Sequence, residues 1–330
     1  MRKISMLPVA ILISMTSVNG QQLEILTQGN STSIRGLSVV SDEIVWTSGS
    51  KGMVGRSVDG GKNWNWNQVP GFEKREFRDI EAFDDLNALV LAIAEPGIIL
   101  KTADGGKSWR PVYTDSSAGI FLDAFHFTGN GSGIVIGDPL KGEIYLASTN
   151  DYGNSWKRNL KAPKADSGEA CFASSGTNIV ALKNGGYYFV TGGLSSRLHG
   201  AGTVTRLPLV QGKESTGANS IAVFGNNAVV VGGDFTRDTA KANNCIIVRL
   251  GKVPVFTTST TPPQGYRSCV EFIDASNLIT CGTSGVDISA DGGKNWKLIS
   301  KESFHVCQKA RKGNAIFLAG GNGRIAKYLP

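Results

Sequence analysis

Charged side chains recur at the start of short apolar segments along this chain, and their types could support ligand recognition. Three of them are arginines, and guanidinium groups gathered in one place bind carboxylates or phosphates through paired hydrogen bonds. Acidic residues and one histidine take corresponding positions in other segments. If the fold brings these segments together, the candidate binding residues are Arg35, Arg78, Asp79, Asp123, Glu169, Arg267 and His305.

Signatures of catalysis are missing from the sequence. It contains no Gly-x-Ser-x-Gly nucleophile elbow, no dinucleotide fingerprint opening a helix and no Cys-x-x-Cys pair. The histidines His126, His199 and His305 stand alone and form no zinc motif. The sequence therefore predicts no catalytic residue, no cofactor and no metal site.

An internal repeat indicates which segments carry the charged residues. The pattern Ser/Thr-x-Asp-x-Gly-x-x-Trp occurs four times, and its aspartates are separated by 45, 47 and 140 residues. Because 140 is about three times 47, two degenerate copies are expected near positions 198 and 245. Repeats of 40 to 50 residues indicate propellers or similar arrays. The repeated residues are Asp59, Gly61, Trp64; Asp104, Gly106, Trp109; Asp151, Gly153, Trp156; and Asp291, Gly293, Trp296.

We interpret these repeated residues as structural. An Asp followed by Gly between two strands is a turn signal, because the carboxylate accepts backbone N–H groups and Gly supplies a positive φ. A calcium loop would need further oxygen ligands at alternate positions, where Lys62, Lys107 and Lys294 would hinder binding.

Seven units follow from β-type segments that begin near residues 34, 77, 121, 169, 219, 266 and 304. The seventh unit ends before its own repeat turn, so its outermost strand must come from elsewhere, and residues 23–26 are the predicted donor. The predicted fold class is all-β: a seven-bladed β-propeller of four-stranded antiparallel blades, with its ring closed by the N-terminal strand.

The repeated turn resembles the Asp-box, or bacterial neuraminidase repeat, and the seven-unit layout of residues 21–330 is most similar to the family of the photosystem II stability and assembly factor and its bacterial relatives. That resemblance implies a non-catalytic scaffold that binds a protein or another acidic, carboxylate-bearing partner, with an arginine-rich patch by the central channel. Asp-box proteins also include sialidases, so the alternative is a sialidase-like glycoside hydrolase with a glycan ligand, in which Arg35, Arg78 and Arg267 would form the carboxylate-binding trio.

Two further alternatives concern the binding surface. In a propeller the first residues of the inner strands meet at one mouth of the channel, where the arginines either bind a partner or pair with Asp79, Asp123 and Glu169 in a neutral network. For His305, a hydrogen-bonded core position is favoured over a binding role, since Phe304 and Val306 flank it. The longer loops of residues 190–245 are the competing interface.

Composition and the first twenty residues limit the partners and the location. Arg2 and Lys3 precede an apolar run that is too short to span a bilayer, which is typical of a cleaved signal peptide over residues 1–20. We therefore expect a secreted or periplasmic, monomeric protein without a transmembrane segment.

Removal of the signal peptide lowers the net charge from +7 to +5 (34 − 2 − 27). The basic residues are scattered along the chain, which argues against nucleic acid as a partner. Cys171, Cys269 and Cys307 lie in apolar, strand-like surroundings and are interpreted as small buried hydrophobic side chains, and a Cys269–Cys281 bridge is the leading candidate for a disulfide among the five cysteines.

Overall fold

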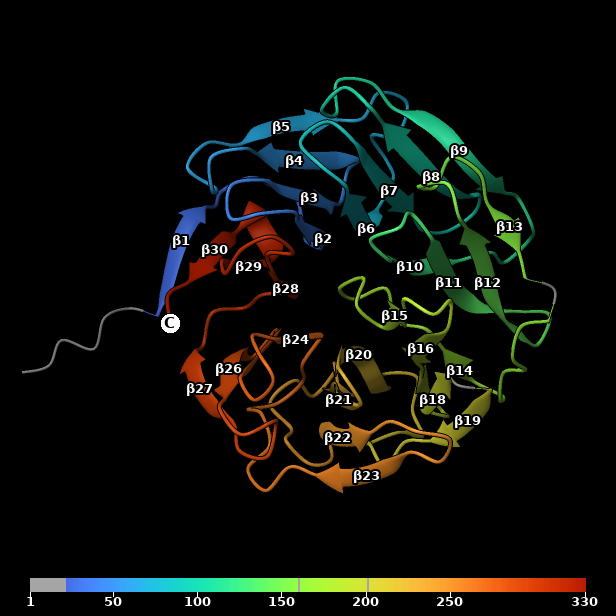
Figure 1. Cartoon of the computed structure of the whole chain (residues 1–330), viewed down its shortest axis with the longest axis vertical. Coiled ribbons are helices and arrows are strands. Elements are labelled where there is room, and N and C mark those ends of the chain that lie inside the picture. The colour runs from blue at the N-terminus through green and yellow to red at the C-terminus, as the bar shows by residue number, and fades with distance from the viewer. Residues whose placement is uncertain (1–21, 160, 201) are drawn as a thin grey trace, which may run out of the picture.

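The computed structural model describes residues 22–159, 161–200 and 202–330, and these form a ring of seven radial β-sheets around a central channel (Figure 1). The predicted signal peptide lies outside the described residues. Within the described ranges no helix is long and apolar enough to cross a membrane. Among the described residues the one helical element is a short 3-10 turn, η1 (Gly321–Gly323).

The first three blades each contain four consecutive antiparallel strands, counted outwards from the channel. Their strands are β2 (Ile34–Val39), β3 (Val45–Gly49), β4 (Met53–Ser57) and β5 (Asn65–Gln68); β6 (Phe77–Ala82), β7 (Ala88–Ala92), β8 (Gly97–Thr102) and β9 (Arg110–Asp115); and β10 (Leu122–Phe127), β11 (Gly133–Leu140), β12 (Glu143–Thr149) and β13 (Lys157–Arg158).

The fourth and fifth blades carry the insertions. Blade 4 consists of β15 (Ile179–Ala181), β16 (Tyr187–Val190), β18 (Arg197–Gly200) and β19 (Thr203–Arg206), and blade 5 of β20 (Thr216–Phe224), β21 (Asn227–Asp234), β22 (Cys245–Arg249) and β23 (Val255–Thr258). Two short strands, β14 (Glu169–Ala170) and β17 (Gly192–Gly193), extend the blade 5 sheet along β20.

Blade 6 contains β24 (Cys269–Phe272), β25 (Leu278–Gly282), β26 (Gly285–Ser289) and β27 (Lys297–Ser300). Blade 7 contains β28 (Val306–Lys309), β29 (Ile316–Ala319), β30 (Ile325–Tyr328) and, as its outermost strand, β1 (Leu23–Thr27). Leu23 pairs with Tyr328, so the predicted closure by the N-terminal strand is confirmed. The seven-bladed, four-stranded prediction is confirmed with it.

The assignment of Glu169 to an inner strand was wrong. The inner strand of blade 4 is β15, ten residues later, and Glu169 lies in β14. The degenerate repeat turns expected near positions 198 and 245 are also displaced, because those positions lie within β18 and β22, and the outer turns follow each strand. Inserted residues in this half of the ring shift the repeat.

Each of the four repeat turns is held by the same hydrogen bonds. In the second, the Thr102 hydroxyl donates to Asp104 at 2.8 Å and accepts the Gly106 N–H at 3.0 Å, while Asp104 also accepts the Ser108 N–H at 3.0 Å. Hydrogen bonds of this kind, from Ser108 above all, hold the pKa of Asp104 at about 2. Asp59 and Asp151 share that low pKa, and hydrogen bonds also lower the pKa of Asp291. These contacts agree with a structural interpretation of the box.

Thr102→Val tests that interpretation at constant side-chain shape. The change leaves the buried N–H of Gly106 without its acceptor, so we expect the free energy of unfolding to fall by about 1–3 kcal/mol. Urea unfolding measures this. Thr114→Val, at an exposed position of β9, is the matched control and should change stability little. Equal effects of the two substitutions would contradict the structural role.

Candidate binding site at the channel mouth

A repeated irregularity in the inner strands positions the mouth residues. In blades 1, 2, 3 and 5 the register between the two innermost strands skips one inner-strand residue near its start, which is a β-bulge. The skipped residues are Arg35, Arg78, Asp123 and Asn219. Because a bulge turns its extra residue out of the regular alternation, these side chains leave the sheet surface at equivalent points around the channel.

Three of the bulge residues, Arg35, Arg78 and Asn219, line a cavity of about 540 Å³ at this mouth. Aromatic rings form another part of its wall: Phe172 meets Phe235 edge to face at 6.0 Å, and Phe235 meets Tyr266 at 6.3 Å. The Tyr266 hydroxyl donates to Asn219 at 2.9 Å. The mouth therefore combines two guanidinium groups with an aromatic ridge.

Within the described part of the chain, the two mouth arginines donate hydrogen bonds to backbone carbonyls and not to carboxylates. Arg35 donates to the Ser174 carbonyl at 3.2 Å and Arg78 to the Ala173 carbonyl at 3.1 Å. Arg78 also lies 3.5 Å from the Glu76 carboxylate, and no ion pair of Arg35 occurs in the described ranges. Burial, and then repulsion from Arg78, lower the pKa of Arg35. An anion bound here would relieve that repulsion.

A segment between β14 and β15 lies next to these arginines at the inner ends of the blades. Residues 172–178, the plug segment, reach in towards the central axis just before β15 (Figure 1). Ser175 donates to the Ser268 carbonyl of the blade 6 entry at 2.7 Å, and Thr177 exchanges a hydrogen bond with Ser220 of blade 5 at 2.7 Å. The plug segment thus makes hydrogen bonds to four other blades.

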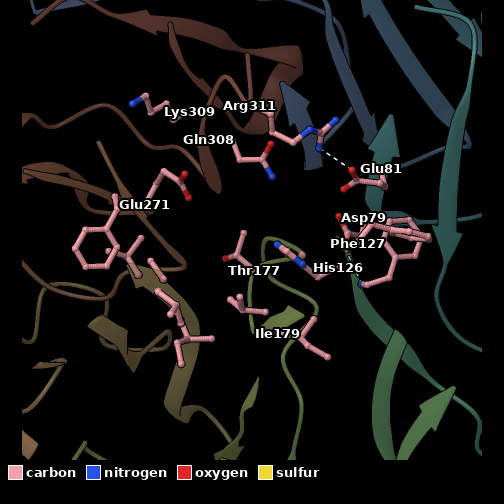
Figure 2. A pocket seen from close by; sticks show the side chains of 18 of the residues that line it. Asp79, Glu81, His126, Phe127, Thr177, Ile179, Glu271, Gln308, Lys309 and Arg311 are labelled. Carbon is pink, nitrogen blue, oxygen red and sulfur yellow. Dashed lines mark hydrogen bonds and ion pairs between the residues drawn. The ribbon is translucent and has the colours of Figure 1, made fainter. Parts of the chain in front are cut away.

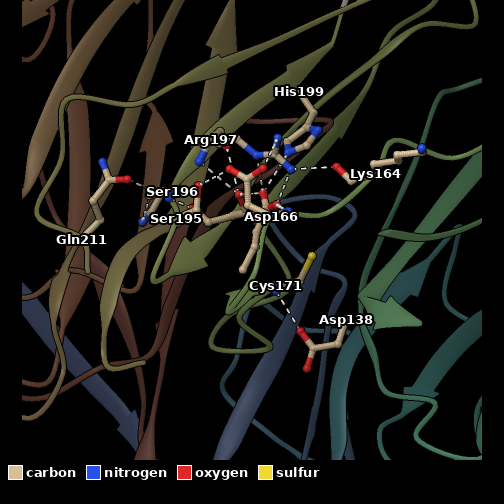
Figure 3. Close-up of polar contacts among 12 residues, drawn as sticks. Asp138, Lys164, Asp166, Cys171, Ser195, Ser196, Arg197, His199 and Gln211 are labelled. Atoms are coloured by element: carbon tan, nitrogen blue, oxygen red, sulfur yellow. Dashed lines mark hydrogen bonds and ion pairs between the residues drawn. The ribbon is translucent and has the colours of Figure 1, made fainter. Parts of the chain in front are cut away.

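Glu169 belongs to a separate polar cluster between blades 4 and 5 (Figure 3). Arg197 donates its Nε–H to Glu169 at 3.0 Å, and His199 lies 3.1 Å from the same carboxylate oxygen. These hydrogen bonds, opposing a burial effect that acts the other way, lower the pKa of Glu169 to about 2. Burial lowers the pKa of His199 as well. This cluster fixes the insertion loops and leaves Glu169 outside the mouth.

Arg267 is also withdrawn from the mouth. Its Nε–H donates to Asp287 at 2.8 Å, and the side chains of both residues are fully buried. Its remaining donors reach the Tyr266 carbonyl and the Ser284 hydroxyl, both at 2.8 Å. Arg267 and Tyr266 thus point to different sides of the chain, and Arg267 does not converge with Arg35 and Arg78.

The other two candidates hold blades together. Asp79 is buried and accepts the N–H groups of Ile80 at 2.8 Å and of Phe125 in blade 3 at 2.9 Å, while burial raises its pKa. His305 uses Nδ1 in a 2.8 Å contact with the Ile34 carbonyl of blade 1, and burial lowers its pKa to about 4. Among the described residues, Arg197 pairs with Glu169, and no arginine pairs with Asp79 or Asp123. The predicted neutral network of the mouth arginines with these three carboxylates is therefore not formed.

A second cavity, of about 230 Å³, opens at the far ends of the inner strands (Figure 2). Glu81 and Arg311 form an ion pair at 2.6 Å along its wall, and Glu271 and Lys309 face it from blades 6 and 7. Burial raises the pKa of Glu271 to about 8. The sequence did not single out these residues, Asn219 or Phe172, whereas Phe235 belongs to the loops of residues 190–245 that were expected as the competing interface. Their only sequence signal is position within the repeat, which the insertions disrupt.

The cysteines do not form the proposed bridge. Cys269 and Cys281 are register partners in β24 and β25, but all five cysteines are free thiols and all are buried. The Cys269 sulfur instead lies 3.7 Å from the Cys307 sulfur of blade 7. Buried thiols in apolar surroundings behave as small hydrophobic side chains.

Comparison with known proteins agrees with this architecture. The family model of the photosystem II assembly factor YCF48 matches residues 14–196, which is more than half of the chain. The chain belongs to the YCF48 family. No curated protein sequence matches it.

Solved structures show the same fold. A structure described as YCF48 bound to D1 peptide superposes with a TM-score of 0.68 at 16% identity, covering 95% of this chain and 96% of that one. YCF48 from Cyanidioschyzon merolae gives 0.66 at 16% identity, covering 94% and 99%. The Pan2 WD40 domain of Neurospora crassa gives 0.59 at 12% identity, covering 93% and 95%. The last likeness shows that the propeller fold extends beyond the YCF48 family.

Proposed function

We propose that this YCF48-family chain is a non-catalytic assembly-factor-like scaffold that binds an exposed carboxylate of a partner protein at the Arg35–Arg78 mouth. The supporting observation is the pair of arginines, which repel each other and, among the described residues, each donate one hydrogen bond, to a carbonyl of the plug segment. Five N–H donors per guanidinium leave ample capacity for a carboxylate. The solved structure of a YCF48 with a bound D1 peptide favours a protein partner over a glycan.

The aromatic ridge fits the same role. Phe235 is 48% exposed and lies beside Phe172 and Tyr266 at the cavity wall. Exposed aromatic rings next to charged anchors are typical of residues that contribute most of the energy in protein interfaces. Because Phe235 belongs to the loop that follows β21, the mouth and the loops of residues 190–245 form one continuous surface. A partner would then contact both candidate interfaces at once.

We also propose that the protein acts outside the cytoplasm, as a secreted or periplasmic monomer. The support is the signal-like sequence of residues 1–20. Expression with and without these residues, followed by cell fractionation, tests the location, and light scattering of the purified protein tests the monomeric state.

Arg35→Ala with Arg78→Ala tests the binding site. We expect peptides with a free C-terminal carboxylate to bind the unchanged protein, and each lost charged hydrogen bond should weaken binding about 10-fold or more. Fluorescence anisotropy with a library of labelled octapeptides measures this, with C-terminally amidated copies as ligand controls.

Arg249→Ala is the matched protein control, because Arg249 is exposed on β22 away from the mouth. It should leave affinity unchanged. Equal binding of free and amidated peptides, or full binding by the double variant, would overturn the proposed site. Hydrolysis of aryl sialosides that disappears in the double variant would instead favour the sialidase-like alternative.

A further inference from the structure

Three potential metal-ligating groups converge beneath the mouth, although they are far apart in the sequence. The carboxylates of Asp123 and Asp138 and the thiol of Cys171 place one ligand atom each within 4.8 Å of the other two. Asp123 comes from the bulge of β10, Asp138 from the irregular end of β11, and Cys171 from the chain that leads into the plug segment.

Asp123 is the observation that points to a ligand. The residue is completely buried, and neither of its carboxylate oxygens has a hydrogen-bond partner within the part of the chain that the structure describes. A buried, unpaired carboxylate is strongly unfavourable, so such a group is normally neutralised or bound to a cation. Arg78 is close enough to act on Asp123 by charge, but no ion pair joins them in the described ranges, because Arg78 contacts Ala173 and Glu76.

The surroundings of the cluster already orient its ligands. The Cys171 N–H donates to Asp138 Oδ1 at 2.8 Å, which fixes that carboxylate beside the thiol (Figure 3). Outer hydrogen bonds of this type hold ligating groups in position. Asp138 and Cys171 also line the 540 Å³ mouth cavity, so solvent ions have a route to the cluster.

We propose that Asp123, Asp138 and Cys171 bind a divalent transition-metal ion of the zinc type. A thiolate with two carboxylates suits a borderline-soft ion, whereas Ca²⁺ and Mg²⁺ prefer oxygen ligands in larger number. Tetrahedral zinc would need its ligand atoms about 3.3–3.7 Å apart, so the three ligand atoms, which lie within 4.8 Å of one another, would move together only modestly. Binding releases the thiol proton to solvent and leaves at least one coordination position for water from the mouth.

This inference goes beyond the proposed function, because the site needs neither the peptide nor a free guanidinium. It also accounts for the carboxylates lying together under a basic mouth. A metal ion between the two carboxylates would stabilise both negative charges.

Cobalt titration of chelator-treated protein tests the proposal directly. We expect one equivalent of Co²⁺ to produce a thiolate-to-cobalt charge-transfer band in the near ultraviolet, and Zn²⁺ to displace it and raise the melting temperature. Cys171→Ala should abolish the band, and Asp123→Asn should weaken Co²⁺ binding about 10-fold or more. Cys245→Ala, which removes a buried thiol from blade 5, is the matched control and should keep the band.

Several outcomes would overturn the site. No band in the unchanged protein, or a band that persists in Cys171→Ala, contradicts it. If Asp123→Asn raises the melting temperature and Zn²⁺ does not change that of the unchanged protein, the carboxyl groups of Asp123 and Asp138 share a proton and bind no metal. The Arg35→Ala, Arg78→Ala double variant should still bind Co²⁺, so failure of the peptide site and failure of the metal site are distinguishable.

Discussion

Arg267→Ala is expected to lower the free energy of unfolding by about 3–5 kcal/mol, because it leaves the fully buried carboxylate of Asp287 without its partner. The guanidinium also donates to the Tyr266 carbonyl and the Ser284 hydroxyl, and these acceptors would lose their donor too. Urea unfolding, monitored by tryptophan fluorescence and extrapolated to water, measures the loss.

A paired substitution separates the cost of the orphaned charge from a general loss of packing. Arg267→Met combined with Asp287→Leu removes both charges and keeps most of the buried volume, so we expect the double variant to recover most of the stability. If Asp287→Leu alone and the double variant were equally unstable, the ion pair would not be the cause. A loss below about 1 kcal/mol in Arg267→Ala would show that the pair is exposed to water.

Trp46→Ala is expected to cost about 3–5 kcal/mol through the cavity that it leaves between blades 1 and 2. Trp46 is completely buried, and its indole N–H donates to the Asp84 carbonyl of the next blade at 3.1 Å. Its ring also lies under Gly106 of the second repeat turn, where an added Cβ would be only 3.3 Å away. Substitution therefore removes packing, a hydrogen bond and support for a neighbouring turn.

Trp66→Ala is the matched control for this prediction. Trp66 lies half-buried on the outer strand β5 and stacks on Trp64 with a centroid separation of 5.7 Å. Its loss should cost no more than about 1–2 kcal/mol. Trp46 belongs to the buried cluster between blades 1 and 2, whereas Trp66 packs, partly buried, against a different cluster, so similar losses in both variants would contradict the packing argument.

The overall architecture could be predicted because its signal is local and repeated. Asp104 contacts Thr102, two residues before it, and Ser108, four residues after it, so the local sequence contains everything that a repeat turn needs. The donor strand for closure was also predictable, since residues 23–26 were the remaining β-type segment outside the seven units.

The fourth blade could not be predicted in the same way. Ala170, Cys171 and Phe172 form an apolar run like those that begin other inner strands, yet the chain continues as the plug segment. Its contacts are with distant residues, and Gly176 passes so close to Asp79 that a Cβ would lie 2.3 Å from the carboxylate. Such long-range contacts leave no periodic pattern in the sequence.

The candidate site was predicted only in part for a related reason. Counting from the start of each unit placed Arg35 and Arg78 at the mouth, because both lie at equivalent bulges. The same count placed Arg267 there, but its partner Asp287 lies twenty residues later on β26 and draws the side chain away. Which side of a strand a charge occupies depends on such partners, and residue spacing does not reveal them.

Closure of the ring by β1 has a consequence for biosynthesis. Leu23 leaves the ribosome 305 positions (328 − 23) ahead of its partner Tyr328, so at usual elongation rates it waits on the order of 15–60 s for a strand to pair with. During that time the nascent chain carries an unpaired β-strand at one end and an unfinished blade at the other. A holding chaperone, or export before folding, would protect the chain from pairing with its neighbours.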